Sequence, residues 1–472
     1  MTVAPPKPAK PFDRSIVEGP LPQAVWRLAW PTMLGNIIGG IQGVIDHVLV
    51  GNFVGYTANA AIGVAWQIFL VVIVFVSSVF AGMGVLVARF AGAGDADKVN
   101  RTVYQAFLTA VALAVGVLAP LGYLLSPALL KIVNATPEVR AEALPFLRIM
   151  FVFSFGMLIF FMMSGALRAA GDARTPLRLG IILTMLNIAL NLILIPGLGP
   201  IPRLGTAGAA MGTVIAGAVV TVIAIWGLFS GRWVITLHRG MDWRPDWSII
   251  RSLFRFGLPA GFQGVAMNVA GVLLLRFIGS LERSAEAQAA YAVGYVELFS
   301  FITWTSVGLM GATAAVTGQN LGAGRLDRAA GAVRVASRFG LGVAAFMGLL
   351  FVTMPRQLLA GFGMDDPVVA ELGVQLLGFL SVSGLFITVA LTYTGGLQGA
   401  GDTKSPFYIS LISQIGVPLG LCAILQAVRG LQPADIWTAI LLGHATRCAL
   451  SVLRFRQEKW RHIKVEIEPA RG

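Results

Sequence analysis

The sequence predicts an all-α membrane protein with about twelve transmembrane helices in two parallel six-helix lobes and pseudo-two-fold symmetry along the membrane normal. Three observations support this class: the composition, a series of long apolar stretches, and an internal repeat. The chain is 56% hydrophobic and 12% charged, with a mean hydropathy of +0.79, which argues against a water-soluble domain. Spanning segments must be helices or closed barrels, and the sequence lacks the alternating segments of about ten residues typical of a β-barrel.

The apolar stretches are long enough to cross a membrane, because about 20 helical residues span the hydrocarbon core. They lie near residues 28–51, 60–88, 102–125, 145–166, 177–196, 205–229, 254–279, 289–317, 333–354, 371–395, 406–427 and 435–455. Since six spans is an even number, both halves start on the same side of the membrane and the repeats are parallel. Two bundles that meet at a seam can rock to expose a central site alternately, so this layout favours a carrier.

The internal repeat is clearest in two connecting strings. Residues 171–176, Gly-Asp-Ala-Arg-Thr-Pro, return 230 positions later as residues 401–406, Gly-Asp-Thr-Lys-Ser-Pro. The glycine suits a helix C-terminus. Thr175 and Ser405 are predicted to be N-caps, each followed by proline at the first helical position. We therefore expect a structural connector, with a gating role as the alternative.

The charges indicate how the chain is oriented. The net charge is +13, and with the loops assigned alternately to the two sides, about 26 of the 35 Lys and Arg fall on the side of both termini. This bias predicts a multi-pass protein of the cell (inner) membrane with both termini in the cytoplasm. The basic balance then reflects topology, and no nucleic-acid partner is expected. The two cysteines lie in apolar stretches, so no disulfide framework or Cys-rich metal site is expected.

The predicted domain organisation follows from the repeat. Residues 1–24 form a cytoplasmic tail, 25–230 the N-lobe, 231–253 a cytoplasmic linker, 254–456 the C-lobe, and 457–472 a second cytoplasmic tail. The linker carries tryptophan beside arginine, a composition that suits the membrane interface, so part of it is expected to lie flat there.

Acidic residues within the apolar stretches are the candidate functional groups, since a charge at the bilayer centre costs at least about 2.5–3.5 kcal/mol. Of 22 Asp and Glu, only Asp46 and Glu297 lie there. Gln42 shares the face of Asp46 one turn earlier, and Gly39 and Gly43 are expected to let another helix approach. A carboxyl group at this place can hold a proton or, once ionised, attract a cation; the alternative is a structural aspartate.

Polar residues on the fifth apolar stretch offer partners for this acid. Thr184, Asn187 and Asn191 are three and four residues apart and point the same way on a helix. Two amides on an otherwise apolar helix need partners, and a cavity lined by Asp46 would supply them. The alternative is packing between helices, at about 0.6 kcal/mol per hydrogen bond.

The second acid leaves two interpretations open. Glu297 falls near mid-membrane, and its repeat counterpart is Gln67. It either forms a structural ion pair with Arg276 or serves, with Gln42 and Gln67, a substrate site or second coupling site. On the twelfth stretch, His444 and Arg447 are spaced three apart and are expected to be structural.

The order of these features resembles the MATE (multidrug and toxic compound extrusion) transporters, closer to the proton-coupled prokaryotic (DinF-like) branch. The resemblance covers about residues 28–455. It is carried by Pro31, Val44-Ile45-Asp46 and Gly51, residues 167–172 (Leu-Arg-Ala-Ala-Gly-Asp), Asn187-x-x-x-Asn191, Gly205-x-x-Gly208-Ala209-Ala210-x-x-Thr213, and residues 396–402 (Gly-Leu-Gln-Gly-Ala-Gly-Asp). Similar proteins extrude organic cations and other amphipathic compounds in exchange for H⁺ or Na⁺.

The resemblance implies roles for particular residues. Cation coupling is expected at Asp46, Asn187, Asn191 and Thr213, and a gating hinge at Pro31, Gly39 and Gly43. Several relatives have a second acid where this chain has Asn191, so the resemblance does not support a relay of two carboxylates. Relatives that couple to Na⁺ through the C-lobe usually have acids in helices seven and ten, which here have none in mid-span. This disfavours Na⁺ coupling at that place.

We therefore predict a secondary active multidrug efflux antiporter that exchanges amphipathic or cationic organic compounds for a cation, with H⁺ ahead of Na⁺. No nucleophile triad, metal-ligand set or nucleotide-binding loop occurs in context, so we expect a transporter and not an enzyme, without a cofactor or metal. The expected partners are small organic substrates and the lipid bilayer, and the chain is expected to be a monomer. The alternatives are a lipid-linked saccharide flippase of the same superfamily, a Na⁺-coupled exporter, an intramembrane enzyme and a non-transporting scaffold.

Overall fold

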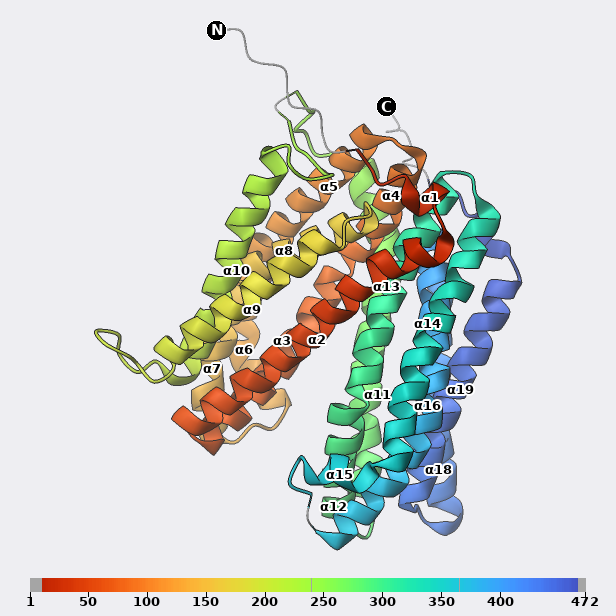
Figure 1. Ribbon diagram of the computed structural model, residues 1–472. Coiled ribbons are helices and arrows are strands. Elements are labelled where there is room, and N and C mark those ends of the chain that lie inside the picture. Colours follow the sequence, from red (N-terminus) through yellow and green to blue (C-terminus); the bar gives the residue numbers. More distant parts are fainter. Residues whose placement is uncertain (1–10, 239, 365, 466–472) are drawn as a thin grey trace. The chain divides into compact units, whose positions relative to one another are not determined.

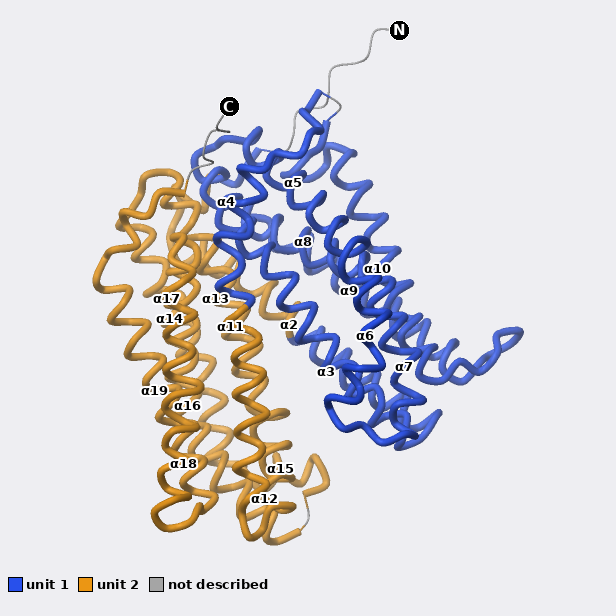
Figure 2. The backbone as a smooth tube through the Cα atoms, turned by 180° about the vertical axis from the view of Figure 1, so that it is seen from behind, with its two compact units in different colours: residues 1–13, 37–261, 466–472 blue, residues 14–36, 262–465 orange. Residues whose placement is uncertain are grey.

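A computed structural model describes residues 11–238, 240–364 and 366–465 (Figure 1). Within these ranges the chain consists of helices and connecting loops, with no strand. Two compact units are distinguished by the contacts within them (Figure 2). Of the described residues, unit 1 contains 11–13 and 37–261, and unit 2 contains 14–36 and 262–465.

The helices of the first half are α1 (Ser15–Glu18), α2 (Leu21–Phe53), α3 (Tyr56–Ser77), α4 (Val79–Ala93), α5 (Ala96–Leu113), the π-helical η1 (Ala114–Leu118), α6 (Ala119–Ile132), α7 (Pro137–Val152), α8 (Phe155–Ala169), α9 (Arg174–Leu194) and α10 (Gly205–Phe229). Those of the second half are α11 (Trp247–Gly279), α12 (Ser284–Tyr291), the π-helical η2 (Ala292–Leu298), α13 (Ser300–Gly322), α14 (Leu326–Thr353), α15 (Pro355–Ala360), α16 (Pro367–Ala400), α17 (Lys404–Ser410), the π-helical η3 (Leu411–Gly416), α18 (Val417–Arg429), α19 (Pro433–Arg456) and the 3₁₀ turn η4 (Lys459–His462).

The number of apolar helices confirms the predicted class. In the described part of the chain, eleven helical segments are long and apolar enough to cross a membrane. The pair α7 and α8, bent by 54° at a short break, makes a twelfth if it is counted as one span. The predicted stretch near 145–166 corresponds to this bent pair, so its apolar residues belong to two helices.

Two long helices each contribute to both contact-defined units; the predicted lobe bounds, 25–230 and 254–456, stay a prediction. The first part of α2 belongs to unit 2, and the first part of α11 belongs to unit 1 together with linker residues 231–253. Close backbone packing accounts for both assignments. A Cβ on Gly308 of α13 would lie 2.8 Å from Met33 Cα, and a Cβ on Gly82 of α4 would overlap the Leu253 carbonyl. Glycine at these two positions therefore allows the helices to touch.

The repeated strings form helix connectors, as predicted, but their caps differ from the prediction. Gly171 and Gly401 adopt positive φ values of 100° and 94°. Thr175 and Ser405 are not the N-caps, because α9 begins at Arg174 and α17 at Lys404. The aspartate of each string caps the helix instead. Asp172 accepts hydrogen bonds from the backbone and side chain of Thr175 at 3.0 and 2.5 Å. Asp402 accepts the equivalent bonds from Ser405 at 3.1 and 2.8 Å.

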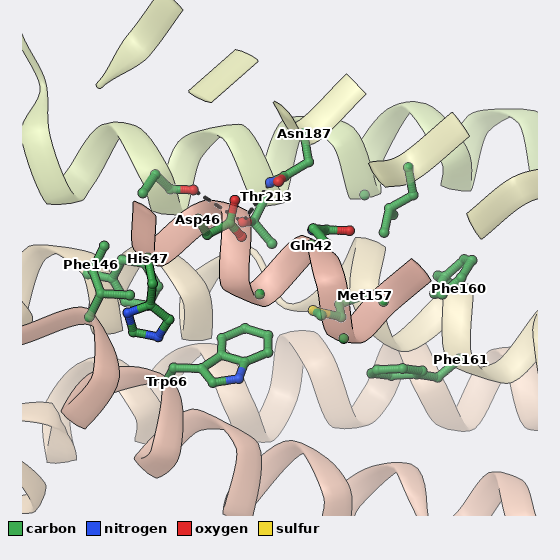
Figure 3. A pocket seen from close by; sticks show the side chains of 17 residues that line it. Gln42, Asp46, His47, Trp66, Phe146, Met157, Phe160, Phe161, Asn187 and Thr213 are labelled. Atoms are coloured by element: carbon green, nitrogen blue, oxygen red, sulfur yellow. Dashed lines mark hydrogen bonds between the residues drawn. The ribbon is translucent and has the colours of Figure 1, made fainter. Parts of the chain in front are cut away.

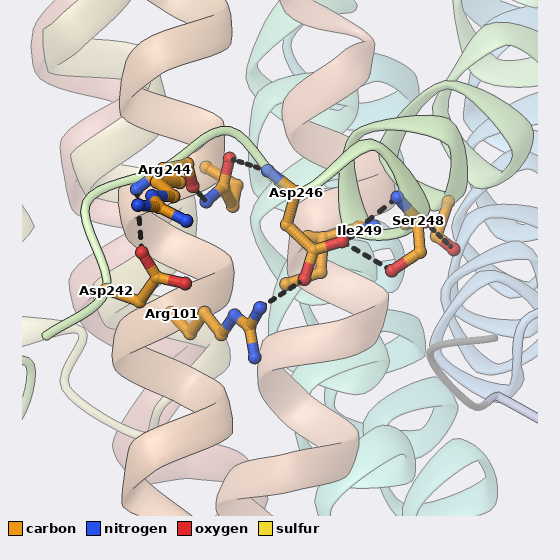
Figure 4. A network of polar contacts seen from close by, with 8 residues as sticks. Arg101, Asp242, Arg244, Asp246, Ser248 and Ile249 are labelled. Carbon is orange, nitrogen blue, oxygen red and sulfur yellow. Dashed lines mark hydrogen bonds and ion pairs between the residues drawn. The ribbon is translucent and has the colours of Figure 1, made fainter. Parts of the chain in front are cut away.

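The linker packs against α5 within unit 1 (Figure 4). Tyr104 donates to the Trp243 carbonyl, and Gln105 Nε2 to the Arg244 carbonyl, both at 2.8 Å. Arg101 forms an ion pair of 2.7 Å with Asp246, which caps the start of α11. Burial opposes the ionised form of Asp246, but hydrogen bonds from Ser248 and the backbone and the nearby Arg101 charge together lower its pKa below the ordinary value. Contact of the linker with the membrane interface stays a prediction.

Candidate functional site

Three helices of unit 1 bring the predicted polar residues together. Asn191 on α9 donates through Nδ2 to Asp46 Oδ1 on α2, at 2.8 Å. Asn187 on α9 and Thr213 Oγ1 on α10 lie 3.0 Å apart in a hydrogen bond. Thr184, one turn before Asn187, donates to Gln42 Oε1 at 2.7 Å, which ties α9 to α2 a second time. We call these six side chains, Gln42, Asp46, Thr184, Asn187, Asn191 and Thr213, the polar cluster.

Glycine on α10 leaves the space in which Asn191 lies. A Cβ on Gly212 would overlap Asn191 Oδ1, and a Cβ on Gly208 would come within 2.7 Å of the Leu194 carbonyl. Both amides of α9 are fully buried. Asn191 Oδ1 has no hydrogen-bond partner, so the amide is held through its nitrogen and its oxygen is an unused acceptor. The position of Asn191 therefore depends on the close packing of α9 against α10.

The polar cluster borders a cavity of about 360 Å³ (Figure 3). Asp46, Gln42, Asn187 and Thr213 point into it (Figure 3). Its remaining walls are largely apolar and aromatic, with Gly39, Gly40, Gly43, His47, Ile62, Trp66, Phe146, Met157, Phe160, Phe161, Leu183, Ala209 and Gly217. A mainly apolar pocket with a few convergent polar groups is the usual form of a small-molecule site.

The carboxyl group of Asp46 has no basic partner. Among the described residues, no Lys, Arg or His forms an ion pair with it. His47 is adjacent in sequence, but its Nδ1 lies 2.6 Å from Asn59 Oδ1. An ionised Asp46 would therefore be stabilised by hydrogen bonds and by the adjacent His47, but by no ion pair among the described residues, so a proton or a cationic ligand could neutralise it.

The orientation of the Asn187 amide bears on the same carboxyl group, because amide oxygen and nitrogen are assigned from the hydrogen-bond network. As drawn, Asn187 Oδ1 accepts from Asn191 Nδ2 at 3.3 Å. With the amide turned over, Asn187 Nδ2 donates to Asp46 Oδ1 at 3.1 Å, and Asn187 Oδ1 accepts from Thr213 Oγ1 at 3.0 Å. The first orientation places Asn187 Oδ1 next to Asp46 Oδ1, and the turned-over amide replaces this contact with a hydrogen bond to the carboxyl group.

The other predicted site residues lie elsewhere. Glu297 is in η2 of unit 2, and the predicted ion pair with Arg276 does not form: Arg276 is exposed on α11. Gln67 is exposed on α3, beside the cavity residue Trp66 but outside the lining. Pro31 lies inside an unbroken α2, so its predicted role as a hinge stays a prediction.

The expectation for two glycines of α2 is wrong in its physical basis. Gly39 and Gly43 were expected to let another helix approach, yet a Cβ on either would meet nothing within 4 Å. Both residues line the cavity instead. Their lack of a side chain enlarges the cavity next to Asp46, and their predicted gating role stays untested.

Sequence reasoning missed the aromatic walls. Met157, Phe160 and Phe161 project from α8, and Trp66 and Phe146 from α3 and α7. Apolar residues at helical spacing mark a buried or lipid-facing helix as readily as a cavity wall, so periodicity alone did not single them out. Within residues 11–238, 240–364 and 366–465, no group of three or more His, Cys, Asp or Glu side chains is arranged to hold a metal ion.

Comparison with known proteins identifies the relatives of this chain. The family model described as MatE matches residues 31–193 and 259–424. A probable multidrug resistance protein NorM of Thermotoga maritima is 28% identical over 442 residues, covering 92% of each chain. A probable multidrug resistance protein NorM of Deinococcus radiodurans is 30% identical and covers 89% of this chain and 92% of the relative.

Solved structures show the same fold. The outward-facing conformation of a multidrug resistance MATE family transporter of the MOP superfamily has a TM-score of 0.85 at 20% identity, covering 97% of this chain and all of that one. A MATE crystal structure in the straight conformation has a TM-score of 0.86 at 20% identity, with the same coverage. With both repeats matched by the family model and relatives that span nearly the whole chain, the protein belongs to the MATE family of transporters.

Proposed function

We propose that this protein is a secondary active multidrug antiporter, which exports amphipathic or cationic organic compounds in exchange for protons by alternating access. The observation that carries the proposal is the carboxyl group of Asp46, without a basic partner, at the wall of a cavity of about 360 Å³. The names of the relatives, multidrug resistance proteins, support the substrate class.

The cavity suits a hydrophobic cation better than other small molecules. An ionised Asp46 would attract positive charge, and the faces of Trp66 and the phenylalanines would receive the apolar body of the ligand. A cation over an aromatic ring gains about 0.5–2 kcal/mol, with the larger value in a desolvated site. The glycines of α2 leave room for ligands of different shapes next to the carboxyl group.

Exchange follows from competition for one carboxyl group. A proton and an organic cation each neutralise Asp46, so binding of one weakens binding of the other. Protonation from the outer side would release the compound there, and loss of the proton to the cytoplasm would restore the negative charge.

The finer features of location belong to the same proposal. We propose that the chain resides in the inner membrane with both termini in the cytoplasm, because the Lys and Arg gather on the side of the termini. We further propose that a single chain is the working unit, because the polar cluster and the cavity are complete within unit 1.

The test is transport by the full chain in proteoliposomes, with a pH gradient and a Na⁺ gradient imposed separately. The wild type is expected to export a lipophilic organic cation when the pH gradient is present and to be indifferent to Na⁺. Asp46→Asn removes the ionisable group with little change in shape, so it should abolish the response to the pH gradient. Glu297→Gln is the matched control, because it removes the second intramembrane acid but leaves the polar cluster intact.

Three results would contradict the proposal. The mechanism is wrong if Asp46→Asn, folded and inserted, still follows the pH gradient. Transport that follows only the Na⁺ gradient would favour the Na⁺-coupled exporter. Loss of the pH response in Glu297→Gln, with Asp46→Asn unaffected, would move the coupling group to unit 2.

A further inference from the structure

Unit 2 contains a second cavity, of about 140 Å³, at positions that correspond by the internal repeat to those of the first. Six pairs of lining residues correspond. An offset of 228 residues relates Gly39 to Met267, Gly43 to Gly271, and Asp46 to Leu274. An offset of 229 relates Ile62 to Tyr291 and Trp66 to Tyr295, and an offset of 230 relates Thr213 to Gly443. The duplication has therefore produced two versions of one pocket.

The second pocket lacks the acid of the first and lies beside a buried base. Leu274 stands where unit 1 has Asp46. Arg447 on α19 corresponds to Gly217 of the first cavity lining, but it lies behind the lining of the second cavity. It is 2% exposed, and its Nη1 donates to the Sδ of the lining residue Met267 at 3.8 Å. Its Nε has no hydrogen-bond partner, and no acidic side chain in the described part of the chain forms an ion pair with it. A buried cation is expensive unless it is paired.

Two polar groups that line this cavity have atoms without hydrogen-bond partners. His444, one turn before Arg447, lines the cavity and is 3% exposed, and its Nδ1 has no hydrogen-bond partner. Gln414 also lines the cavity, with an unpartnered Nε2. Buried polar atoms in proteins are paired with few exceptions. Together with Arg447, these groups form an unused set of hydrogen-bond donors when His444 is protonated at Nδ1.

The surroundings hold these groups in place. The His444 ring stacks on Phe299 and Tyr295, with centroids 5.7 and 6.4 Å away. Tyr295 and Gln414 lie in the π-helical segments η2 and η3, and such segments occur frequently at functional sites. The aromatic stack gives the cavity a flat apolar wall beside the donors.

We propose that the cavity of unit 2 binds a small organic carboxylate, whose two oxygens meet the guanidinium of Arg447 and whose hydrocarbon part lies against the aromatic stack. A planar guanidinium matches a carboxylate in a bidentate arrangement. His444 and Gln414 supply further donors to the same anion. The volume fits a compact group, since an apolar cavity of about 150 Å³ admits benzene.

An inorganic anion would share the attraction to Arg447. A spherical ion such as chloride uses neither the fork geometry of the guanidinium nor the flat aromatic wall. The carboxylate is therefore the occupant that the shape favours, and chloride is an outcome that the experiment distinguishes. This site is separate from the proposed proton exchange at Asp46, so it can be tested by binding alone.

The experiment is calorimetric titration of the full chain in lipid nanodiscs, in a buffer whose only anions are bulky sulfonates. Sodium benzoate is the probe, and benzamide and sodium chloride are the neutral and inorganic comparisons. Benzoate is expected to bind, and Arg447→Gln should weaken it at least about thirtyfold, because a buried charge loses its partner. Arg447→Lys keeps the positive charge but lacks the planar guanidinium, so its affinity for benzoate should lie between those of the wild type and Arg447→Gln.

Two variants keep the result clear. Gly271→Leu adds a side chain to the cavity lining and leaves Arg447 in the sequence; a Cβ on Gly271 meets nothing within 4 Å, so the backbone can accept the substitution. It should also abolish benzoate binding, even if Arg447→Gln fails to fold. Arg276→Gln, at an exposed arginine of α11, is the matched control and should bind as the wild type does.

Failure of the proposal has distinct forms. Absence of benzoate binding to the wild type, or unchanged binding in Gly271→Leu, would overturn it. Equal binding of benzamide would show an apolar site without anion recognition, and tighter binding of chloride would replace the carboxylate with an inorganic anion.

Discussion

The cavities of the two units have related sequences but opposite chemistry. The cavity of unit 1 measures about 360 Å³ and is lined by an acid, Asp46, that forms no ion pair with any residue the structure describes. The cavity of unit 2 measures about 140 Å³ and adjoins a base without an acidic partner, Arg447. The helices around each cavity derive from the same duplicated half. A duplication therefore preserves the positions that line a pocket, while a few substitutions decide which charge the pocket accepts.

The largest effect is expected from Gly212→Ala in unit 1. The added Cβ would overlap Asn191 Oδ1, so the Asn191 amide must shift, and we expect this shift to break its hydrogen bond to Asp46. We expect proton-driven efflux in proteoliposomes to fall by about a hundredfold, as for a reacting group misplaced by roughly 1 Å.

The matched control for this variant is Gly180→Ala, on the same helix as Asn191. Its Cβ would meet only Phe160 Cζ, at an ordinary contact distance of 3.9 Å, so efflux should stay near the wild-type rate. If Gly212→Ala transports as well as Gly180→Ala, the Asn191–Asp46 bond is not needed for coupling.

A smaller effect is expected when the acid of unit 1 is introduced into unit 2. Leu274→Asp places a carboxylate in the lining of the second cavity, where it can pair with Arg447 or with His444. Benzoate binding should weaken by about tenfold or more, because the site then holds its own anion. Calorimetric titration of benzoate in lipid nanodiscs measures the affinity. Leu274→Asn is the uncharged control of nearly equal size. Equal weakening in both variants would show a steric effect and leave the charge reversal without a role.

The acid of unit 1, its amide partners and the number of spans could be predicted from the sequence, because each follows from the cost of placing polar groups in a bilayer or from helix geometry. Charges are rare in apolar stretches, so Asp46 was found without structural information. The helical spacing of Asn187 and Asn191 placed both amides on one face, and both lie in the polar cluster. The span count also followed from hydropathy, since a bilayer requires a minimum helix length.

What could not be predicted depends on contacts between distant residues. The sequence predicts a structural Arg447, and this stays a prediction; what the sequence could not show is that no acid among the described residues forms an ion pair with it. The same limit left two alternatives open for Glu297, an ion pair with Arg276 or a second coupling site. Gly39 and Gly43 gave the opposite error, since glycine permits a close helix contact or an open cavity equally well.

The smallest expected effect compares the two connectors at Asp172 and Asp402. Each aspartate caps a helix, but Asp402 is 6% exposed and also accepts two hydrogen bonds from Arg454, at 2.8 and 2.9 Å. Asp172→Ala should cost about 1 kcal/mol, the usual value of a lost cap, and Asp402→Ala about 2–3 kcal/mol, since a charged hydrogen-bonded pair is also broken. Thermal unfolding of the detergent-solubilised chain measures both.

The Arg454→Ala variant isolates the ion pair from the cap. In a double-mutant cycle with Asp402→Ala, the coupling energy should be about 1–2 kcal/mol, since Arg454 contacts the carboxylate directly. A coupling energy near zero, or equal losses at Asp172 and Asp402, would show that the connectors of the two units have the same stability despite the ion pair. In that case the divergence between the units would be confined to their cavities, and the connectors would remain two copies of one structural element.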